Sequence, residues 1–283
     1  MNNSNFVISN DNIFNAHNTR VHSIDTIVTS MVKHVDMSLA NALVLKSKLP
    51  DSMTIHSLGV SSSVDDQGTV HFKTSSPVPV PVSERLIGFS GFAFRHFMNN
   101  LCNLKNANYL EVGVYRGATL ISSIYGNESV MGEVHAVDNY SEFTDYSDPK
   151  AAYHKALDRY LPNTKDKIQF HEKDCFNLDL SILPKIDIYF YDGEHSAESQ
   201  YRAFKYFEPI FADCFIAVVD DWEQRKVREG TKRAFEEINY DVVASRAVIP
   251  GMRPDNVSRI ENPTLDWWCG THVAVLRKRG SSE

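Results

Sequence analysis

Apolar and polar positions divide the chain near residue 82. Beyond it, short apolar runs alternate with longer segments in which apolar residues recur at helical spacing. This alternation predicts parallel strands joined by helices, so the fold class is α/β, with a doubly wound and mostly parallel seven-stranded sheet. The expected strands cover residues 109–112, 133–137, 167–171, 186–191, 214–219, 241–245 and 271–277. The expected helices cover residues 90–104, 118–125, 149–160, 196–207 and 231–238.

Residues 1–82 follow a different pattern, and we assign them to an N-terminal extension ahead of a main domain at 83–283. Residues 1–22 show no clear period, whereas apolar positions over 24–48 recur at helical spacing and predict an amphipathic helix. Three prolines alternate with valines just before the main domain and exclude a helix from that linker. We expect the amphipathic helix to cover the main domain or to form a homodimer contact.

The first expected strand leads into a glycine-rich turn. Gly113 and Gly117 bracket the turn, and a helical segment begins at Ala118. This arrangement brings backbone N–H groups against a ligand at the positive end of a helix. The second strand ends in Asp138, at a spacing that suits a carboxylate binding ribose hydroxyls. The pattern therefore predicts a nucleoside ligand.

The glycine spacing distinguishes between nucleoside cofactors. A dinucleotide fingerprint needs glycines where Tyr115 and Ala118 stand, so NAD is disfavoured. The motif present, Glu111-x-Gly113-x-x-x-Gly117, resembles the first motif of the class I S-adenosylmethionine (SAM)-dependent methyltransferases. Tyr115 replaces the usual central glycine, as in some small-molecule O-methyltransferases of that class. The resemblance implies that Glu111, Gly113, Tyr115 and Gly117 belong to the cofactor site.

The resemblance extends to later strand ends. Asp174 and Cys175 follow the third strand, where the family places an acid on the adenine amino group and a backbone N–H against the ring. An alternative for Asp174 is a turn-capping acid. Asp138 is expected on the ribose, and Asp192 within reach of the cofactor.

Three carboxylates follow the fourth and fifth strands: Asp192, Asp220 and Asp221. Neighbouring parallel strands bring their ends together, and bare carboxylates so close repel or take up a proton. A hard divalent cation such as Mg²⁺ or Ca²⁺ removes this repulsion, so we predict a metal site. The alternative is that one or two of these acids cap helices or form salt bridges.

Residues 105–280 resemble the metal-dependent, macrocin-type sugar O-methyltransferases, which share the Asp-Gly-x-His element at Asp192 and the later Asp-Asp pair. A DNA or protein amino-methyltransferase would often carry Asn/Asp-Pro-Pro-aromatic after the fourth strand, so oxygen is the favoured acceptor atom. The resemblance offers two candidates for the base, Glu194 and His195, of which we favour Glu194. Trp267 and Trp268 could wall the cleft, although core packing is the commoner use of tryptophan.

Composition narrows the partners and the location. The formal charge is −7 and no long basic block occurs, so nucleic acid is not an expected partner. No signal peptide or transmembrane-length apolar run is evident, so we expect a cytoplasmic protein without a membrane partner. The four cysteines form no C-x-x-C pair, which signals neither zinc nor a disulfide framework.

These patterns predict a SAM-dependent O-methyltransferase with a small-molecule acceptor, such as a sugar, polyol or secondary metabolite, and with Mg²⁺ assistance. Two alternatives stay open. One is a metal-independent methyltransferase of the same fold, and the other is a SAM-binding or scaffold protein without catalysis.

Overall fold

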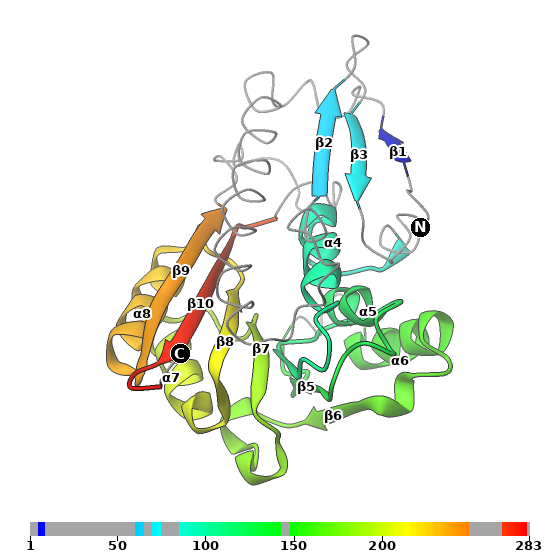
Figure 1. The fold of residues 1–283 in the computed structure, drawn as a ribbon. Helices are drawn as coiled ribbons and strands as arrows, with labels where there is room; N and C mark the ends of the chain where they lie inside the picture. Colours follow the sequence, from blue (N-terminus) through cyan, green and yellow to red (C-terminus); the bar gives the residue numbers. More distant parts are fainter. Residues whose placement is uncertain are drawn as a thin grey trace.

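A computed structural model describes residues 5–8, 60–64, 70–74, 85–142, 148–248 and 268–281. Its main sheet has seven strands in the order β6-β5-β4-β7-β8-β10-β9 (Figure 1). Neighbouring strands from β6 to β8 are parallel, and β10 runs antiparallel to β8 and β9. This sheet confirms the predicted fold class. The strands are β4 (Tyr109–Val112), β5 (Val134–Asp138), β6 (Ile168–Glu172), β7 (Ile186–Tyr191), β8 (Phe211–Val219), β9 (Tyr240–Val248) and β10 (Thr271–Lys278).

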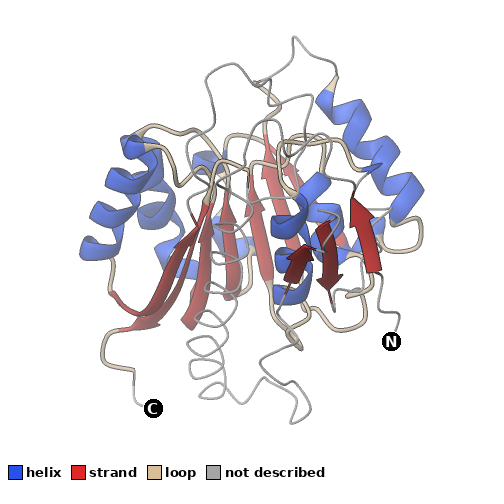
Figure 2. Cartoon of the chain, turned by 90° about the horizontal axis from the view of Figure 1, so that it is seen from above, coloured by secondary structure: helices blue, strands red, loops and turns tan. Residues whose placement is uncertain are grey.

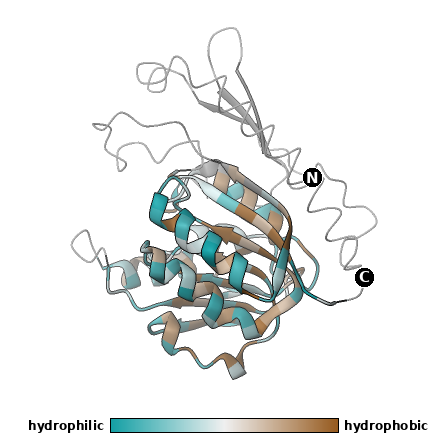
Figure 3. Ribbon diagram, turned by 90° about the vertical axis from the view of Figure 1, so that its left-hand side faces the viewer, coloured by the Kyte–Doolittle hydropathy of each residue, from teal (hydrophilic) through white to brown (hydrophobic). Residues whose placement is uncertain are grey.

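Helices cover both faces of the sheet (Figure 2). Alternate strand residues face opposite sides, so Tyr109 packs into one apolar cluster and Leu110 into the other. In Figure 3 the helices in front alternate between hydrophilic and hydrophobic colours, as expected for helices with one buried side. The α-helices are α4 (Phe92–Leu101), α5 (Ala118–Ile124), α6 (Pro149–Tyr160), α7 (Ala197–Phe207) and α8 (Arg225–Glu237). Short 3₁₀ helices are η4 (Lys165–Lys167), η5 (Cys175–Asn177), η6 (Leu180–Ile182) and η7 (Glu208–Ile210).

Most predicted elements appear within a few residues of their expected bounds. The start of α6 is as expected, because the Asp148 carboxylate accepts a hydrogen bond from the Ala151 N–H at 2.9 Å. The start of α8 differs, since this helix begins at Arg225 rather than at 231. Gly230 does not interrupt it: a Cβ there would lie 2.2 Å from the Ala197 carbonyl, so the glycine permits close packing of α8 on α7.

The described part of the extension forms a small antiparallel sheet of β1 (Asn5–Ile8), β3 (Val70–Thr74) and β2 (Val60–Val64), in that order. Residues 1–22 thus contribute a strand, although four residues are too few to show a period in the sequence. The amphipathic helix expected over 24–48 lies outside the described residues, and the division at residue 82 stays a prediction. Among the described helices, none has the length and apolarity needed to cross a membrane.

Candidate active site

The sheet order places a crevice beside β4. The chain runs from β4 to β5 and β6 on one side, and then returns to β7 on the other side. Ligands bind at such a reversal, outside the carboxyl ends of the strands. Backbone pairing continues past the strand ends, because the Asp192 N–H donates to the Val112 carbonyl at 2.8 Å and the Asp220 N–H to the Tyr191 carbonyl at 3.2 Å. The predicted site residues therefore gather at one edge.

The turn after β4 depends on Gly113. Its φ is +90°, and a Cβ at this position would lie 1.9 Å from the backbone oxygen of Asp192. Only glycine lets the ends of β4 and β7 approach so closely. Gly117 caps α5 with φ 77° and does not line the pocket, unlike the other predicted site residues.

Asp138 holds the turn in shape. Its Oδ2 accepts hydrogen bonds from the Val114 and Tyr115 N–H groups, both at 2.7 Å, and its Oδ1 accepts one from the Tyr140 N–H at 2.7 Å. Tyr115 has φ 52°, a left-handed conformation that is unusual for a bulky residue and natural for the glycine it replaces. Oδ2 thus accepts two hydrogen bonds and Oδ1 only one, so Oδ1 keeps a lone pair that can accept from a ligand.

Glu111 lies at the floor of the pocket and is fully buried. The Tyr109 hydroxyl donates to its Oε2 at 2.5 Å, whereas Oε1 has no hydrogen-bond partner among the described residues. Burial raises the pKa of Glu111 well above its usual range. A buried acceptor without a donor marks a place where a ligand N–H would be stabilised.

At the far end, after β6, the structure places Asp174 and Cys175. The Asp174 carboxylate caps η5 by accepting from the Phe176 N–H at 2.8 Å, and both predicted residues line the pocket. Burial raises the pKa of Cys175 to about 12, so its thiol is protonated and unsuited to nucleophilic attack.

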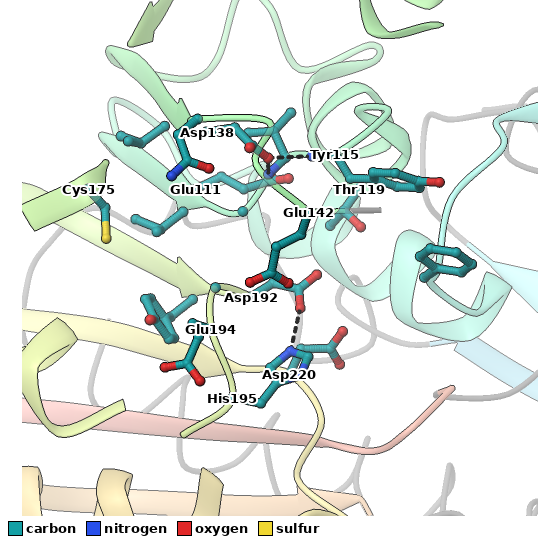
Figure 4. Close-up of a pocket in the computed structure, with 18 of the residues that line it drawn as sticks. Glu111, Tyr115, Thr119, Asp138, Glu142, Cys175, Asp192, Glu194, His195 and Asp220 are labelled. Atoms are coloured by element: carbon teal, nitrogen blue, oxygen red, sulfur yellow. Dashed lines mark hydrogen bonds and ion pairs between the residues drawn. The ribbon is translucent and has the colours of Figure 1, made fainter. Parts of the chain in front are cut away.

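The opposite end carries the acidic cluster (Figure 4). Asp192, His195 and Asp221 each offer one ligand atom, and these atoms lie within 4.8 Å of one another. His195 Nε2 is 2.8 Å from Asp221 Oδ2 and 3.9 Å from Asp192 Oδ1. Asp220 lines the same pocket and is 4% exposed, but it is not part of this three-residue group. His195 therefore lies beside two of the three predicted metal ligands, Asp192 and Asp221.

The three residues of this group and the neighbouring Asp220 differ in charge. Asp192 and Asp221 together raise the pKa of His195 to about 10, so its ring is cationic at neutral pH. Burial and the neighbouring carboxylates raise the pKa of Asp192 to about 6 and that of Asp220 well above its usual range. Burial alone would raise the pKa of Asp221, but the hydrogen bond and positive charge of His195, together with hydrogen bonds from Cys269 and Gln224, lower it overall.

Glu194, the other predicted base, is exposed and faces its own helix. Its Oε1 accepts from the Ser196 N–H at 2.9 Å and its Oε2 from the Ser196 hydroxyl at 2.5 Å. Glu194 thus binds Ser196, the N-cap residue of α7, while lining the pocket, and His195 forms the ion pair with Asp221.

Some lining residues were not predicted from the sequence. The cavity has a volume of about 620 Å³ and also includes Phe89, Ser90, Glu142 and Gln224. Phe89 and Ser90 precede α4, far from the strand-end motifs, and no local pattern marks them. Gln224 comes three residues after Asp221, and this closeness in the sequence could have marked it as a site residue. In the structure its Nε2 lies 3.5 Å from His195 Nδ1.

Comparisons with known proteins identify a related sequence family and a similar fold. Residues 110–222 match a family described as a methyltransferase domain. A SAM-dependent O-methyltransferase from Thermotoga maritima has a similar structure, with a TM-score of 0.51 and 11% identity, covering 79% of this chain and 79% of that chain. The fold is that of the class I methyltransferases. The domain match supports a methyltransferase.

Two further solved structures are similar at lower scores. The SAH-bound methyltransferase PaMTH1 from Podospora anserina gives a TM-score of 0.44 at 12% identity, over 65% of this chain and 79% of that chain. TrmN from Thermus thermophilus gives 0.48 at 14% identity, over 78% of this chain and 59% of that chain. A comparison with proteins of curated function found no match.

Proposed function

We propose that this protein is a SAM-dependent O-methyltransferase that methylates a hydroxyl group of a small molecule, such as a sugar, a polyol or a secondary metabolite, with the help of Mg²⁺. One observation carries the proposal. The cluster of Asp192, His195 and Asp221 lies in the same cavity as the turn at Gly113 and the carboxylate of Asp138. A methyl donor and an acidified hydroxyl could therefore meet in one cavity.

The residues of the turn suit the donor. Asp138 offers its Oδ1 to a ribose hydroxyl. The unpartnered Oε1 of Glu111 would meet the positively charged amino group of SAM, whose charge would lower the raised pKa of this carboxyl group. Asp174 and Cys175 also line the cavity, and by the resemblance they would contact the adenine ring. In the transfer, a lone pair of the acceptor oxygen attacks the methyl carbon while the carbon–sulfur bond breaks. The sulfonium becomes a thioether, and the hydroxyl proton passes to a base.

The acidic cluster suits a divalent cation. The carboxylates of Asp192 and Asp221 are the kind of oxygen donor that suits Mg²⁺. The pKa of Asp192 is raised first by burial and then by the charge of Asp221, and a cation would relieve this repulsion. Mg²⁺ bound there would supply Lewis-acid stabilisation of the developing oxyanion, which an alkyl alcohol needs. Asp220 could join Asp192 and Asp221 as a ligand or stay protonated and donate a hydrogen bond.

His195 is the better-placed base. It shares the pocket with Asp192 and Asp221, whereas both oxygens of Glu194 accept hydrogen bonds from Ser196. The two carboxylates keep His195 protonated at neutral pH. If Asp192 and Asp221 held a cation, their negative charge would no longer stabilise the protonated ring. The pKa of His195 would then fall toward its ordinary value, and the ring could accept the hydroxyl proton.

The 2.8 Å pair of His195 with Asp221 also favours a second candidate, a methyltransferase that works without metal. In that case the ion pair itself offsets part of the negative charge, and Asp221 orients the imidazole. The acceptor would then need an intrinsically acidic hydroxyl, such as a phenol, because no cation assists its deprotonation.

Transfer of labelled methyl groups from SAM to a panel of neutral polyols and phenols tests the proposal. We expect EDTA to abolish transfer and Mg²⁺ to restore it, and we expect Asp192→Ala to abolish transfer while SAM still binds. The matched control is Asp158→Asn, which removes an exposed acid that pairs with Lys165. Transfer that resists EDTA would select the metal-free candidate, and failure of SAM to bind the wild-type protein would reject both.

A further inference from the structure

An aromatic wall lines the cavity between the cofactor turn and the acidic cluster. The ring of Phe89 stacks on that of Tyr115 at 5.0 Å with an interplanar angle of 9°, and lies 6.1 Å from the ring of Trp268. All three residues line the cavity, and Phe89 and Tyr115 are only half-buried. Tyr115 belongs to the cofactor turn, so Phe89 and Trp268 extend the wall beyond it.

The Trp268 end of the wall is tied to the acidic cluster. The Trp222 N–H donates to the Gly270 carbonyl at 3.1 Å, and the Glu223 N–H donates to the Cys269 carbonyl at 3.0 Å. These bonds fix the segment before β10 beside the residues that directly follow Asp220 and Asp221. A molecule placed against Trp268 would therefore lie next to the cluster and not above the adenine end of the cavity.

The Phe89 end is held by a buried arginine. Arg95, which is 1% exposed, donates from Nη1 to the Leu86 carbonyl at 2.7 Å, from Nη2 to the Gly88 carbonyl at 3.1 Å and from Nε to the Ser90 hydroxyl at 2.8 Å. A fixed guanidinium of this kind sets the backbone on both sides of Phe89. The position of the ring is thus determined before any ligand binds.

Backbone strain also concentrates at this wall. Tyr115 and Trp268 have φ of 52° and 53°, and two other residues that line the cavity, Tyr140 and Asp221, have φ of 52° and 53°. Left-handed conformations are unfavourable for bulky residues, and they persist where the surrounding packing imposes them. Such clustering is typical of sites where side-chain placement serves binding.

The charge of the cavity limits what can bind there. Its described lining includes eight carboxyl side chains, from Glu111, Asp138, Glu142, Asp174, Asp192, Glu194, Asp220 and Asp221. Apart from His195, the cationic side chains of the same lining are Arg116 and Lys173. An acceptor with a phosphate or carboxylate group close to Asp192 and Asp221 would be repelled by these acids, whereas a neutral acceptor would not.

We propose that Phe89 and Trp268 form a subsite for an uncharged ring of the acceptor, with the methylated hydroxyl directed toward Asp192 and Asp221. This inference rests on the proposed function and names its substrate class: a neutral ring with an apolar face and vicinal oxygens. Aromatic diols and pyranosides share this chemistry, because both present C–H or π surface to an aromatic wall.

The test uses ligand-observed NMR titrations of the full chain with Mg²⁺, with and without SAH. Catechol and methyl β-D-glucopyranoside are the neutral probes, and protocatechuate and glucose 6-phosphate are their anionic counterparts. We expect the neutral member of each pair to bind about three- to tenfold more tightly. We expect Phe89→Ala and Trp268→Ala to weaken neutral-ring binding about three- to tenfold, and Trp268→Phe to restore it to within about twofold.

The control is Phe176→Ala, which removes a ring at the opposite end of the cavity. It should weaken SAH binding and leave neutral-ring binding unchanged, the reverse of the Phe89 and Trp268 variants. Phe89→Leu keeps the segment apolar if the alanine variant does not fold.

Neutral rings that bind wild type and wall variants equally, anionic probes that bind as tightly as neutral ones, or no binding by any probe would overturn the inference. Ring binding that depends on Phe89 in a protein that does not bind SAH would support the subsite and overturn the proposed function instead.

Discussion

The imidazole Nε2 of His195 lies 2.8 Å from Oδ2 of Asp221, so residues from the ends of β7 and β8 form one ion pair. The two residues are 26 positions apart in the sequence, and the parallel pairing of β7 with β8 brings them together. The pair controls the protonation of the candidate base, since the pKa of His195 is raised to about 10 by Asp192 and Asp221.

Asp221→Asn removes one of the two carboxylates that keep His195 protonated. We expect the pKa of His195 to fall, because an amide does not stabilise the imidazolium as a carboxylate does. Methyl transfer should fall about 100-fold or more, because Asp221 is also a proposed ligand of the Mg²⁺ that stabilises the developing oxyanion, while SAH affinity is retained. Histidine ring signals in an NMR pH titration and calorimetry with SAH check both parts. An unchanged His195 titration would show that the ion pair does not form.

Gly113→Ala forces a side chain into the backbone of Asp192, where the Cβ would be only 1.9 Å from an oxygen. We expect this substitution to reduce stability by about 3 kcal/mol or more and to abolish SAH binding. Gly280→Ala is a matched control, because Gly280 also has positive φ, at +79°, but a Cβ added there would meet nothing within 4 Å. It should cost about 1 kcal/mol, the conformational penalty alone. Equal losses in thermal unfolding would contradict the close contact.

Arg95→Met tests whether the segment before α4 is held by the guanidinium. The substitution preserves an apolar stem and removes the donors to Leu86, Gly88 and Ser90. We expect a loss of about 2–4 kcal/mol in unfolding free energy, because two buried carbonyls lose their partner. Hydrogen exchange should rise in residues 86–90 and stay unchanged in β7. Protection that is unchanged in 86–90 would show that other contacts fix the segment.

His272 predicts a pH dependence of stability. It is buried and stacks on Trp222 at 4.1 Å, and burial lowers its pKa to about 4. Because the folded-state pKa lies below the unfolded value of about 6.5, this stability is fully present above pH 6.5 and is lost as pH falls toward 4. The loss amounts to at most about 3 kcal/mol. His272→Phe keeps the stack and should flatten the dependence in denaturant unfolding between pH 4 and 7; an unaltered slope would assign the effect to other groups.

The order of helices and strands in the main domain followed from the sequence because apolar runs and helical periods alternate strictly there. Strands β4 and β7 matched their expected bounds, since glycine or aspartate follows each directly. The start of α8 was placed too late, at residue 231, and the contact of Gly230 with Ala197 that packs the first part of this helix on α7 is visible only in the structure. Packing between two helices leaves no local signal.

The site residues that could be predicted from the sequence are those at the carboxyl ends of the strands. Asp138, Asp192 and Asp221 follow strands, and the rule that parallel strands end at one edge placed them together. Of the aromatic wall, Tyr115 and Trp268 were candidates from the sequence. Phe89 was not, because its place depends on hydrogen bonds between its own segment and Arg95 of α4, which leave no pattern in the sequence. The assignment of Asp174 as an adenine contact stays a prediction, and its observed hydrogen bond to the Phe176 N–H matches the turn-capping alternative.

The account depends most on a methyl donor and a divalent cation sharing one cavity. Anomalous diffraction from crystals grown with SAH and Mn²⁺ tests this directly. The account predicts SAH over the Gly113 turn and a manganese peak about 2.2 Å from oxygens of Asp192 and Asp221, next to the sulfur. Bound SAH with no peak among Asp192, His195 and Asp221 would contradict the metal site, and crystals without SAH in the cavity would contradict the central claim itself.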